Sequence, residues 1–282
     1  MKGYFKIKSF AKINLALNVV GKALLFHKVE SVVSFLDLSD EIFIRKINKK
    51  DHKLKFIGKF SKNIGNDNTI SKLLKILDRD ELLKNKKYEI KVNKNIPSEA
   101  GLGGGSMNAA SILNFMIKKE NIKINKKKIT KITKLVGSDV ILGIYSKDLI
   151  LDPTGYIKKI SGLSKKNVLI VKPDFGCSTK KIYAKVKKFN TSKINAPYKK
   201  LFSFSNLAKM SNDLEPVAFK IYPKLKTLKT FLEKMPYIKL ARMTGSGSAM
   251  IAYFSSRKLC KQAEKKVKKH FTKYWCKTAK TI

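Results

Sequence analysis

The chain has 282 residues, of which 43% are hydrophobic, so it can form one large domain or two ordinary ones around a sizeable core. It contains no run of about 18 apolar residues, so no membrane-spanning helix is expected. The first ten residues lack the apolar segment of a signal peptide. Three cysteines without a CxxC spacing argue against a zinc site or a disulfide framework. We therefore expect a cytoplasmic protein.

The formal net charge is +42, from 62 Lys and Arg against 20 Asp and Glu. A nucleic-acid-binding protein could use such a field. However, only four of the basic residues are arginine, the residue that base readout and bidentate phosphate recognition favour. Lysine, asparagine and isoleucine are abundant along the whole chain, and AT-rich codons encode all three. We favour codon bias as the explanation, with nucleic-acid binding as the alternative and a general attraction for nucleotides as a consequence.

The first half of the chain begins with strand patterns. Alternating and branched residues predict a strand over Phe5–Asn18 that enters a turn at Gly21. A second turn is predicted at Leu38–Asp40, between two further strands. In chain order the predicted elements are strands Phe5–Asn18, Val29–Phe35 and Glu41–Ile47, helix Asn68–Leu83, strand Tyr88–Val92, helices Met107–Lys118 and Lys127–Leu135, and strand Leu149–Leu151.

A polar stretch at Asp152–Lys166 follows, with a proline and two glycines. We place a domain boundary there and expect domains at 1–153 and 154–282. Strands and helices without a regular βαβ period indicate an α+β fold. The second half is predicted to contain strand Val168–Val171, helices near Lys180–Lys187, Phe204–Met210 and Leu225–Met235, strand Ala249–Phe254 and helix Arg257–Phe271.

The most informative motif is PSEAGLGGGS at 97–106, between a predicted strand and a predicted helix. Four glycines within five residues are costly in backbone entropy unless main chain must approach a ligand closely. Successive N–H groups and the following helix N-terminus could then hold phosphate oxygens. The spacing fits neither a Walker A motif nor a dinucleotide fingerprint, and a flexible turn is the structural alternative. Ser106 could cap the helix or offer its hydroxyl to a phosphate or to phosphate-bound Mg²⁺.

One acidic residue stands out in a chain with few acids. Asp139 lies among small and apolar residues in the segment VGSDV at 136–140. Phosphoryl transfer to a hydroxyl needs a group that orients the attacking oxygen and accepts its proton, although a helix N-cap would explain the same residue. Lys12, between apolar neighbours on a predicted strand, is a candidate for a positioned charge, although a solvated lysine is the ordinary interpretation.

Four segments together resemble the motifs of the GHMP kinases. Residues 97–110 resemble the family's phosphate-binding motif, with Met107 where a second serine is usual, and residues 11–15 (AKINL) resemble its first motif. Residues 244–248 (TGSGS) resemble the third motif, and residues 137–140 (GSDV) resemble the family's GADV. The resemblance implies a ribosomal S5-like N-terminal domain, a ferredoxin-like C-terminal domain, ATP as phosphoryl donor and Mg²⁺. It also implies direct in-line transfer with Asp139 as base and Lys12 beside it.

Three further segments resemble the branch of this family that phosphorylates the 2-hydroxyl of 4-diphosphocytidyl-2-C-methyl-D-erythritol (CDP-methylerythritol), in the non-mevalonate route to isoprenoid precursors. These are Phe26-His27, residues 173–183 ending in Tyr183, and NDLE at 212–215. Phe26 and Tyr183 could sandwich the cytosine, since stacking contributes about 1–3 kcal/mol per base, and His27 could hydrogen-bond its edge. Core packing is the alternative for both aromatic rings.

The resemblance assigns a role to each candidate residue. We expect the partners to be ATP and CDP-methylerythritol, with no specific nucleic acid, no membrane, and a monomer or homodimer. Another GHMP small-molecule kinase, such as a homoserine, mevalonate or galactose kinase, and an inactive relative are the alternatives. The catalytic candidates are Lys12 and Asp139; the ATP-binding candidates are Asn68, Pro97, Ala100, Gly101, Leu102, Gly103, Gly104, Gly105 and Ser106, the last also a metal contact; the substrate-binding candidates are Asn14, Phe26, His27, Asp139, Tyr183, Thr244, Gly245 and Ser246.

Overall fold

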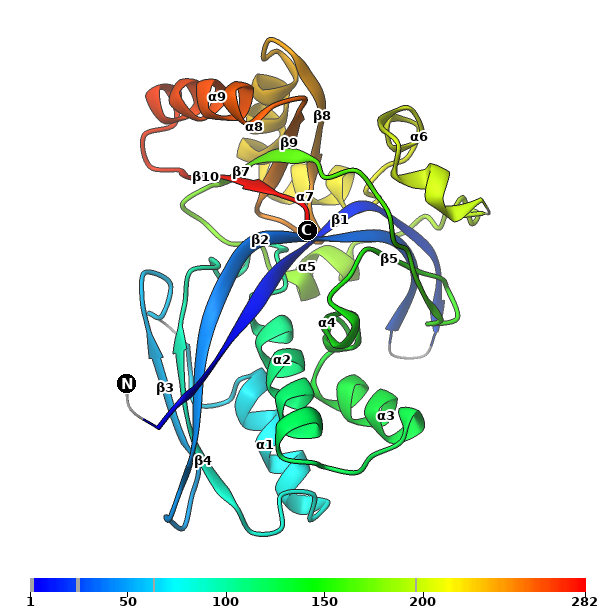
Figure 1. The fold of residues 1–282 in the computed structure, drawn as a ribbon. Coiled ribbons are helices and arrows are strands. Elements are labelled where there is room, and N and C mark those ends of the chain that lie inside the picture. Colours follow the sequence, from blue (N-terminus) through cyan, green and yellow to red (C-terminus); the bar gives the residue numbers. More distant parts are fainter. Residues whose placement is uncertain (1–2, 24–25, 63, 196) are drawn as a thin grey trace. The chain divides into compact units, whose positions relative to one another are not determined.

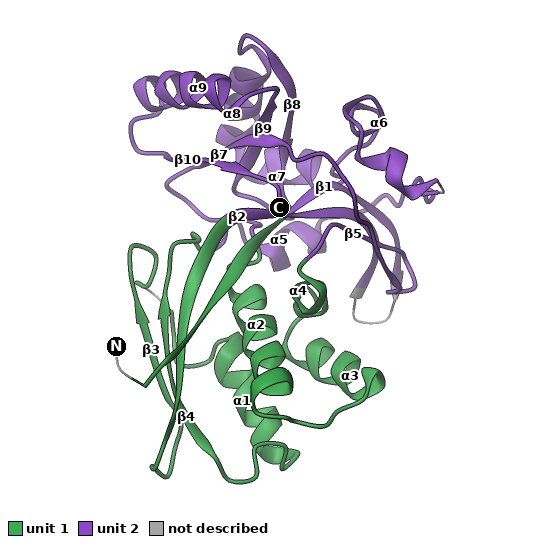
Figure 2. Ribbon diagram, in the orientation of Figure 1, with its two compact units in different colours: residues 1–12, 38–98, 103–146 green, residues 13–37, 99–102, 147–282 purple. Residues whose placement is uncertain are grey.

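The computed structural model describes residues 3–23, 26–62, 64–195 and 197–282 (Figure 1). The chain forms two compact units, each built from several segments (Figure 2). Unit 1 comprises residues 1–12, 38–98 and 103–146, and unit 2 comprises residues 13–37, 99–102 and 147–282. Two long strands, β1 (Phe5–Ala23) and β2 (Phe26–Ile47), contribute to both units. The expected division into consecutive domains at 153/154 stays a prediction.

Unit 1 packs helices against a sheet. Strand β4 (Lys87–Asn93) pairs antiparallel with the end of β2 and parallel with β3 (Lys53–Ile57). Alternate residues of β4 are buried, which is the pattern of a strand with one face on the core. Their partners come from the apolar faces of α1 (Thr69–Arg79) and α2 (Gly104–Lys119). Helices α3 (Lys126–Val136) and α4 (Val140–Tyr145) complete the unit.

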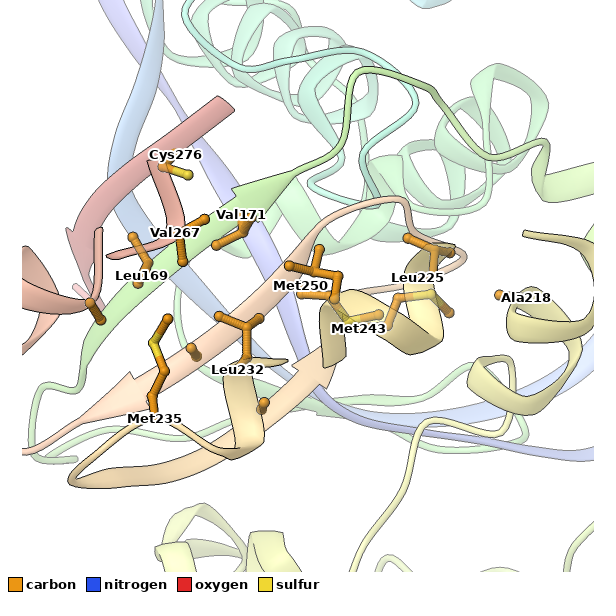
Figure 3. Close-up of a cluster of buried hydrophobic side chains, with 14 of the residues drawn as sticks. Leu169, Val171, Ala218, Leu225, Leu232, Met235, Met243, Met250, Val267 and Cys276 are labelled. Atoms are coloured by element: carbon orange, nitrogen blue, oxygen red, sulfur yellow. The ribbon is translucent and has the colours of Figure 1, made fainter. Parts of the chain in front are cut away.

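Unit 2 contains an antiparallel four-stranded sheet with the order β10-β7-β9-β8. Strand β9, one of its two central strands, is buried along its whole length, and helices α8 and α9 supply apolar partners to the core, as Figure 3 shows. A second strand pairing joins β5 to residues 31–33 of β2 and to β6. The elements of unit 2 not bounded above are β5 (Leu149–Leu151), β6 (Ile157–Lys159), β7 (Asn167–Lys172), α5 (Thr179–Ala184), the 3₁₀ helix η1 (Tyr198–Phe202), α6 (Phe204–Ala208), α7 (Glu215–Ile221), α8 (Pro223–Glu233), β8 (Ile238–Met243), β9 (Met250–Phe254), α9 (Arg257–His270) and β10 (Trp275–Lys280).

Most predicted elements are confirmed with shifted ends, but two predicted turns are wrong. Strand β1 continues through Gly21 to Ala23, and the two strands expected around Leu38–Asp40 are the single strand β2. The Asp40 carboxylate, which suggested a turn, is buried and accepts hydrogen bonds from the main-chain N–H groups of Asn95 and Ile96. The hydrogen-bond partners of the Asp40 carboxylate are therefore distant in the sequence, and the side chain does not need a local turn to supply them.

Several elements were not predicted from the sequence. Each is no longer than seven residues, which is too short for a clear periodic pattern, and β10 is defined by its residue-by-residue pairing with β7. The unpredicted elements are β3, α4, β6, η1, α7, β8 and β10.

Among the described residues, no helix combines the length and the apolar character needed to cross a membrane.

The packing of α8 gives a test of the unit 2 core. Leu228 is fully buried, whereas Lys226 on the same helix is exposed. Leu228→Ala should lower the free energy of unfolding by about 2–5 kcal/mol, because it leaves a cavity. Lys226→Ala should change it by no more than about 0.5 kcal/mol. Urea unfolding followed by circular dichroism measures both, and equal effects would contradict the described packing.

Candidate active site

The glycine-rich loop leads directly into the first turn of α2. Gly103 stands at the helix N-cap with a left-handed φ of +69°, and a Cβ atom there would lie 2.8 Å from Cγ of Lys12. Both the conformation and the space therefore require glycine. The N–H groups of Gly104, Gly105 and Ser106 belong to the first helical turn, where main-chain donors have no partner within the helix. Such donors suit phosphate oxygens.

Ser106 does not cap α2, because the N-cap residue is Gly103. The capping interpretation is therefore wrong, and its hydroxyl lies instead near Gly137: a Cβ atom at Gly137 would be 3.9 Å from Oγ of Ser106. Met107, which departs from the family motif, is buried and packs against Gly143 of α4, where a Cβ atom would come within 3.0 Å of its sulfur. Position 107 is thus a core position in this chain.

Lys12 and Asp139 form an ion pair in unit 1. The Nζ atom of Lys12 lies 3.2 Å from Oδ2 of Asp139, and the lysine side chain is 4% exposed while the aspartate side chain is 41% exposed. Asp139 occupies the N-cap position of α4 but makes no capping hydrogen bond with its side chain. The Asp139 carboxylate therefore pairs with a buried ammonium group and is still accessible. A general base must be accessible in this way to contact a substrate hydroxyl.

A second, buried ion pair lies under the phosphate loop. Lys94 pairs with Asp40, and a Cβ atom at Gly104 would lie 3.3 Å from Nζ of Lys94. Thr69 donates a hydrogen bond of 2.8 Å from its hydroxyl to the carbonyl of Gly105. Neither Lys94 nor Thr69 was predicted as a site residue; in a chain this rich in lysine, no sequence signal distinguishes Lys94.

Asn68, expected on the adenine side, caps helix α1. Its side chain accepts hydrogen bonds from the main-chain N–H groups of Ile70 and Ser71, in a capping box. Its amide group also donates to the carbonyl of Gly65. The side chain therefore holds the start of α1, whose first residue, Thr69, contacts the glycine loop.

In unit 2, three expected residues meet at one hydroxyl. The main-chain N–H of Asn14 donates to Oγ1 of Thr244 over 3.0 Å, and this hydroxyl donates to the carbonyl of Gly101 over 3.1 Å. Gly101 has a φ of +71°, and a Cβ atom there would lie 1.9 Å from the carbonyl oxygen of Thr244. The Asn14 side chain donates to the hydroxyl of Ser31 over 2.8 Å. Hydrogen bonds therefore connect the first motif, the third motif and part of the phosphate loop.

The other expected residues of these loops contribute mainly main-chain groups. The side chains of Pro97, Ala100 and Leu102 are buried, and the carbonyl of Ala100 accepts from the N–H of Ala249. The Ser246 hydroxyl lies 2.7 Å from that of Thr179, an unpredicted neighbour. Gly245 has a left-handed φ of +54°.

The residues expected around the cytosine form a ring cluster in unit 2. The His27 and Tyr183 rings have centroids 5.0 Å apart, and the unpredicted Phe189 ring is 6.2 Å from His27. Burial, and secondly the charge of Lys22, lower the pKa of His27 below its ordinary value, which favours the neutral ring. The side chain of Phe26 lies outside the described part of the chain. The sequence feature that could have identified Phe189 is that it is a single phenylalanine in a loop rich in Lys and Asn.

Comparisons with known proteins identify the family of the chain. Residues 68–148 match the GHMP kinases N terminal domain, and residues 198–273 match the GHMP kinases C terminal domain. The chain belongs to the GHMP kinase family. It is 55% identical over 278 residues, 99% of each chain, to the 4-diphosphocytidyl-2-C-methyl-D-erythritol kinase of Pelagibacter ubique. It is 33% identical to the kinase of the same name from Clostridium tetani, covering 98% of this chain and 100% of that one.

Solved structures share the fold. A 4-(cytidine 5'-diphospho)-2C-methyl-D-erythritol kinase has a TM-score of 0.77 at 21% identity, covering 98% of this chain and 99% of that one. Homoserine kinase from Cytophaga hutchinsonii has a TM-score of 0.74 at 16% identity, covering 100% and 95%. The chain therefore has the mixed α and β, two-domain fold of the GHMP kinases, which is common to kinases named for different substrates.

The close approach of Gly103 to Lys12 gives a prediction with a matched control. Gly103→Ala should lower phosphoryl transfer at least about tenfold, because the added Cβ displaces Lys12 and small misplacements of catalytic groups are costly. Gly155 also has a left-handed φ, +88°, but no neighbouring atom within 4 Å of a Cβ. Gly155→Ala should carry a similar backbone strain of about 1–2 kcal/mol and retain activity. Steady-state kinetics and melting temperatures separate the two, and equal activities would show that Lys12 does not depend on this glycine.

Proposed function

We propose that this chain transfers a phosphoryl group from ATP to the 2-hydroxyl of 4-diphosphocytidyl-2-C-methyl-D-erythritol, in the non-mevalonate route to isoprenoid precursors. The observation that carries the proposal is the Lys12–Asp139 pair beside Gly103, in a chain 55% identical along 278 residues to a kinase of that name. The proposal includes the cytoplasm as location and a monomer or homodimer as assembly.

In the proposed reaction the N–H groups of Gly104, Gly105 and Ser106 bind phosphate oxygens at the positive end of α2. Asp139 orients the acceptor hydroxyl and takes its proton as the oxygen attacks phosphorus in line. Lys12, 3.2 Å from the carboxylate, holds it in place and supplies a positive charge near the transferred group. The other product is ADP, and no covalent enzyme intermediate forms.

The residues present fit a Mg²⁺ ion held largely by the nucleotide. Among the described residues, no group of three or more His, Cys, Asp or Glu side chains is placed to hold a metal ion, and Mg²⁺ commonly keeps waters and binds through substrate phosphates with few protein ligands. The hydroxyl of Ser106, in the first turn of α2, would hold it. When bound, the ion neutralises charge on the phosphates.

The substrate side of the proposed site is formed by Asn14, the ring pair His27 and Tyr183, and the third glycine loop. A neutral His27 can both donate and accept a hydrogen bond, as the edge of a cytosine requires. Tyr183 offers a flat, half-buried ring for stacking. Phe26 as the second wall, Asn68 on the adenine side, and Thr244, Gly245 and Ser246 as substrate contacts remain part of the proposal.

The decisive experiment measures ADP formation by the purified chain with CDP-methylerythritol, homoserine, mevalonate or galactose as acceptor. Only CDP-methylerythritol should stimulate it. Asp139→Asn should lower kcat by about 10²–10⁴-fold, the usual contribution of a general base, with ATP affinity largely kept. The control is Asp67→Asn, which neutralises a carboxylate 3.5 Å from Lys72 that is 73% exposed. An Asp139→Asn enzyme as active as this control would remove Asp139 from the mechanism.

Tyr183→Ala tests the base-binding part of the proposal. Loss of one stacking partner should raise the KM for CDP-methylerythritol about 5–150-fold, corresponding to about 1–3 kcal/mol. The KM for ATP should change little. Tyr237→Ala removes a tyrosine that is 73% exposed and should change neither constant. If Tyr183→Ala raised the KM for ATP instead, or only lowered the melting temperature, Tyr183 would be a packing residue.

A further inference from the structure

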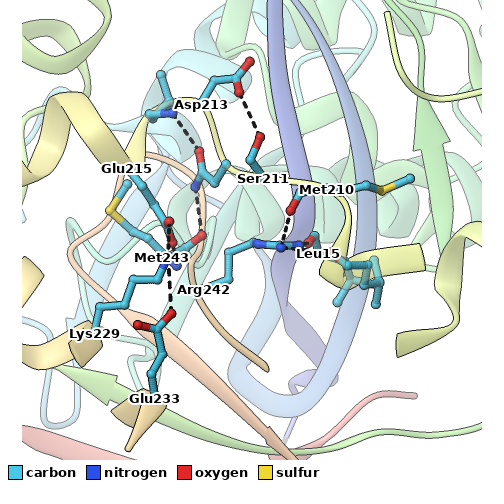
Figure 4. A network of polar contacts seen from close by, with 12 residues as sticks. Leu15, Met210, Ser211, Asp213, Glu215, Lys229, Glu233, Arg242 and Met243 are labelled. Carbon is cyan, nitrogen blue, oxygen red and sulfur yellow. Dashed lines mark hydrogen bonds and ion pairs between the residues drawn. The ribbon is translucent and has the colours of Figure 1, made fainter. Parts of the chain in front are cut away.

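The NDLE segment at 212–215 holds the third glycine loop. Asn212 is 1% exposed, and its side-chain amide group donates one hydrogen bond of 2.8 Å to the carbonyl of Met243 and another of 2.8 Å to that of Gly245. Its side-chain oxygen accepts from the N–H of Leu214 over 3.0 Å. Both amide hydrogens and the oxygen are therefore in use. Figure 4 shows the polar network to which these bonds belong.

The carbonyl of Met243 belongs to the peptide group that precedes Thr244, and the carbonyl of Gly245 belongs to the peptide group between Gly245 and Ser246, so Asn212 holds the main chain on both sides of Thr244. The Thr244 hydroxyl in turn accepts from the N–H of Asn14 and donates to the carbonyl of Gly101. A continuous series of hydrogen bonds thus runs from Asn212 through the third glycine loop to the first motif and to the phosphate loop. Every residue in it belongs to unit 2.

Buried charged groups hold the strand that leads into this loop. Glu215 accepts from the N–H of Met243 over 2.6 Å and pairs with Lys229. The guanidinium of Arg242 donates to the main-chain carbonyls of Leu15, Leu207 and Met210. The hydrogen bonds of Glu215 and Arg242 hold the chain as far as Met243. After Thr244, the side chain of Asn212 donates the hydrogen bond that holds the carbonyl of Gly245.

We propose that Asn212 is a positioning residue for phosphoryl transfer. It orients Thr244, and through the Thr244 hydroxyl it sets the placement of Asn14, on the substrate side, relative to Gly101 of the phosphate loop. The inference rests on the proposed kinase function and adds to it a residue that need not touch either substrate. Reacting groups tolerate little displacement, since a shift of about 1 Å can cost about 100-fold in rate.

Asn212→Asp tests the inference, because it keeps the shape and the acceptor for Leu214 but places an oxygen against the two carbonyls. We expect kcat/KM for CDP-methylerythritol to fall at least about 30-fold, and the ATP dissociation constant, measured by calorimetry, to rise at least about fivefold. The control is Asp213→Asn. Asp213 accepts from the N–H of Val19 over 2.8 Å and from the hydroxyl of Ser211 over 3.0 Å, and the substitution loses an acceptor without altering the bonds to Met243 and Gly245. It should lower the melting temperature similarly and keep activity within about threefold.

Activity and ATP affinity in Asn212→Asp equal to those of Asp213→Asn, at equal loss of melting temperature, would overturn the inference and leave Asn212 a purely structural residue. If the wild-type chain does not phosphorylate CDP-methylerythritol, the proposed function fails; the ATP-affinity comparison still tests the positioning of Gly101 by Asn212. Should Asn212→Asp fail to fold, Asn212→Ala paired with Asp213→Ala gives the same comparison without the charge repulsion.

Discussion

The candidate site depends on the close approach of a lysine side chain to a glycine backbone. The aliphatic part of the Lys12 side chain lies against Gly103, which has a left-handed φ of +69° and cannot carry a Cβ atom without displacing the lysine. The same glycine begins α2 and so orients the first-turn N–H groups of that helix. Gly103 therefore determines both where the Lys12 ammonium group lies relative to Asp139 and how the first-turn N–H groups of α2 are oriented, and such N–H groups suit a phosphate. The absence of a side chain at 103 is thus a steric requirement as well as a conformational one.

Buried carboxylates organise the loops of this very basic chain. A buried carboxylate must be compensated by hydrogen bonds or a partner charge, so each one fixes the main chain that supplies its partners. Asp40 holds residues 94–96, just before the phosphate loop. Glu30 accepts from Asn18, from the Ser192 hydroxyl and from the N–H of Lys193, which anchors the loop that carries Phe189. Glu215 holds Met243 at the start of the third glycine loop. These three buried acids thus lie next to the proposed ligand-binding loops, while most lysines are exposed.

The glycine-rich loop is divided between the two units. Residues 99–102 belong to unit 2, because the carbonyl of Glu99 accepts from the N–H groups of Cys177 and Ser248 and the carbonyl of Ala100 accepts from that of Ala249. Residues 103–106 belong to unit 1, as the start of α2. A short segment rich in glycine suits this double attachment, because its main chain must follow two different sets of hydrogen-bonding partners within a few residues. Thr244, which bonds Gly101, is part of the same arrangement.

The sequence by itself determined the family, the α+β class, and the nucleotide-directed chemistry, because these depend on local motifs: a glycine-dense loop before a helix, an acid among small residues, and apolar periodicity in α1, α2 and α8. The tertiary structure decided what depends on distant partners. It joined two predicted strands into β2, where residues 94–96 satisfy Asp40, and it placed Met107 in the core against Gly143. It also placed Lys94 beside Gly104, Phe189 beside His27, and Asn212 against the carbonyls of Met243 and Gly245. Their residue types are ordinary in this chain, and only the carbonyls, rings and glycines brought next to them by folding distinguish them from similar residues elsewhere.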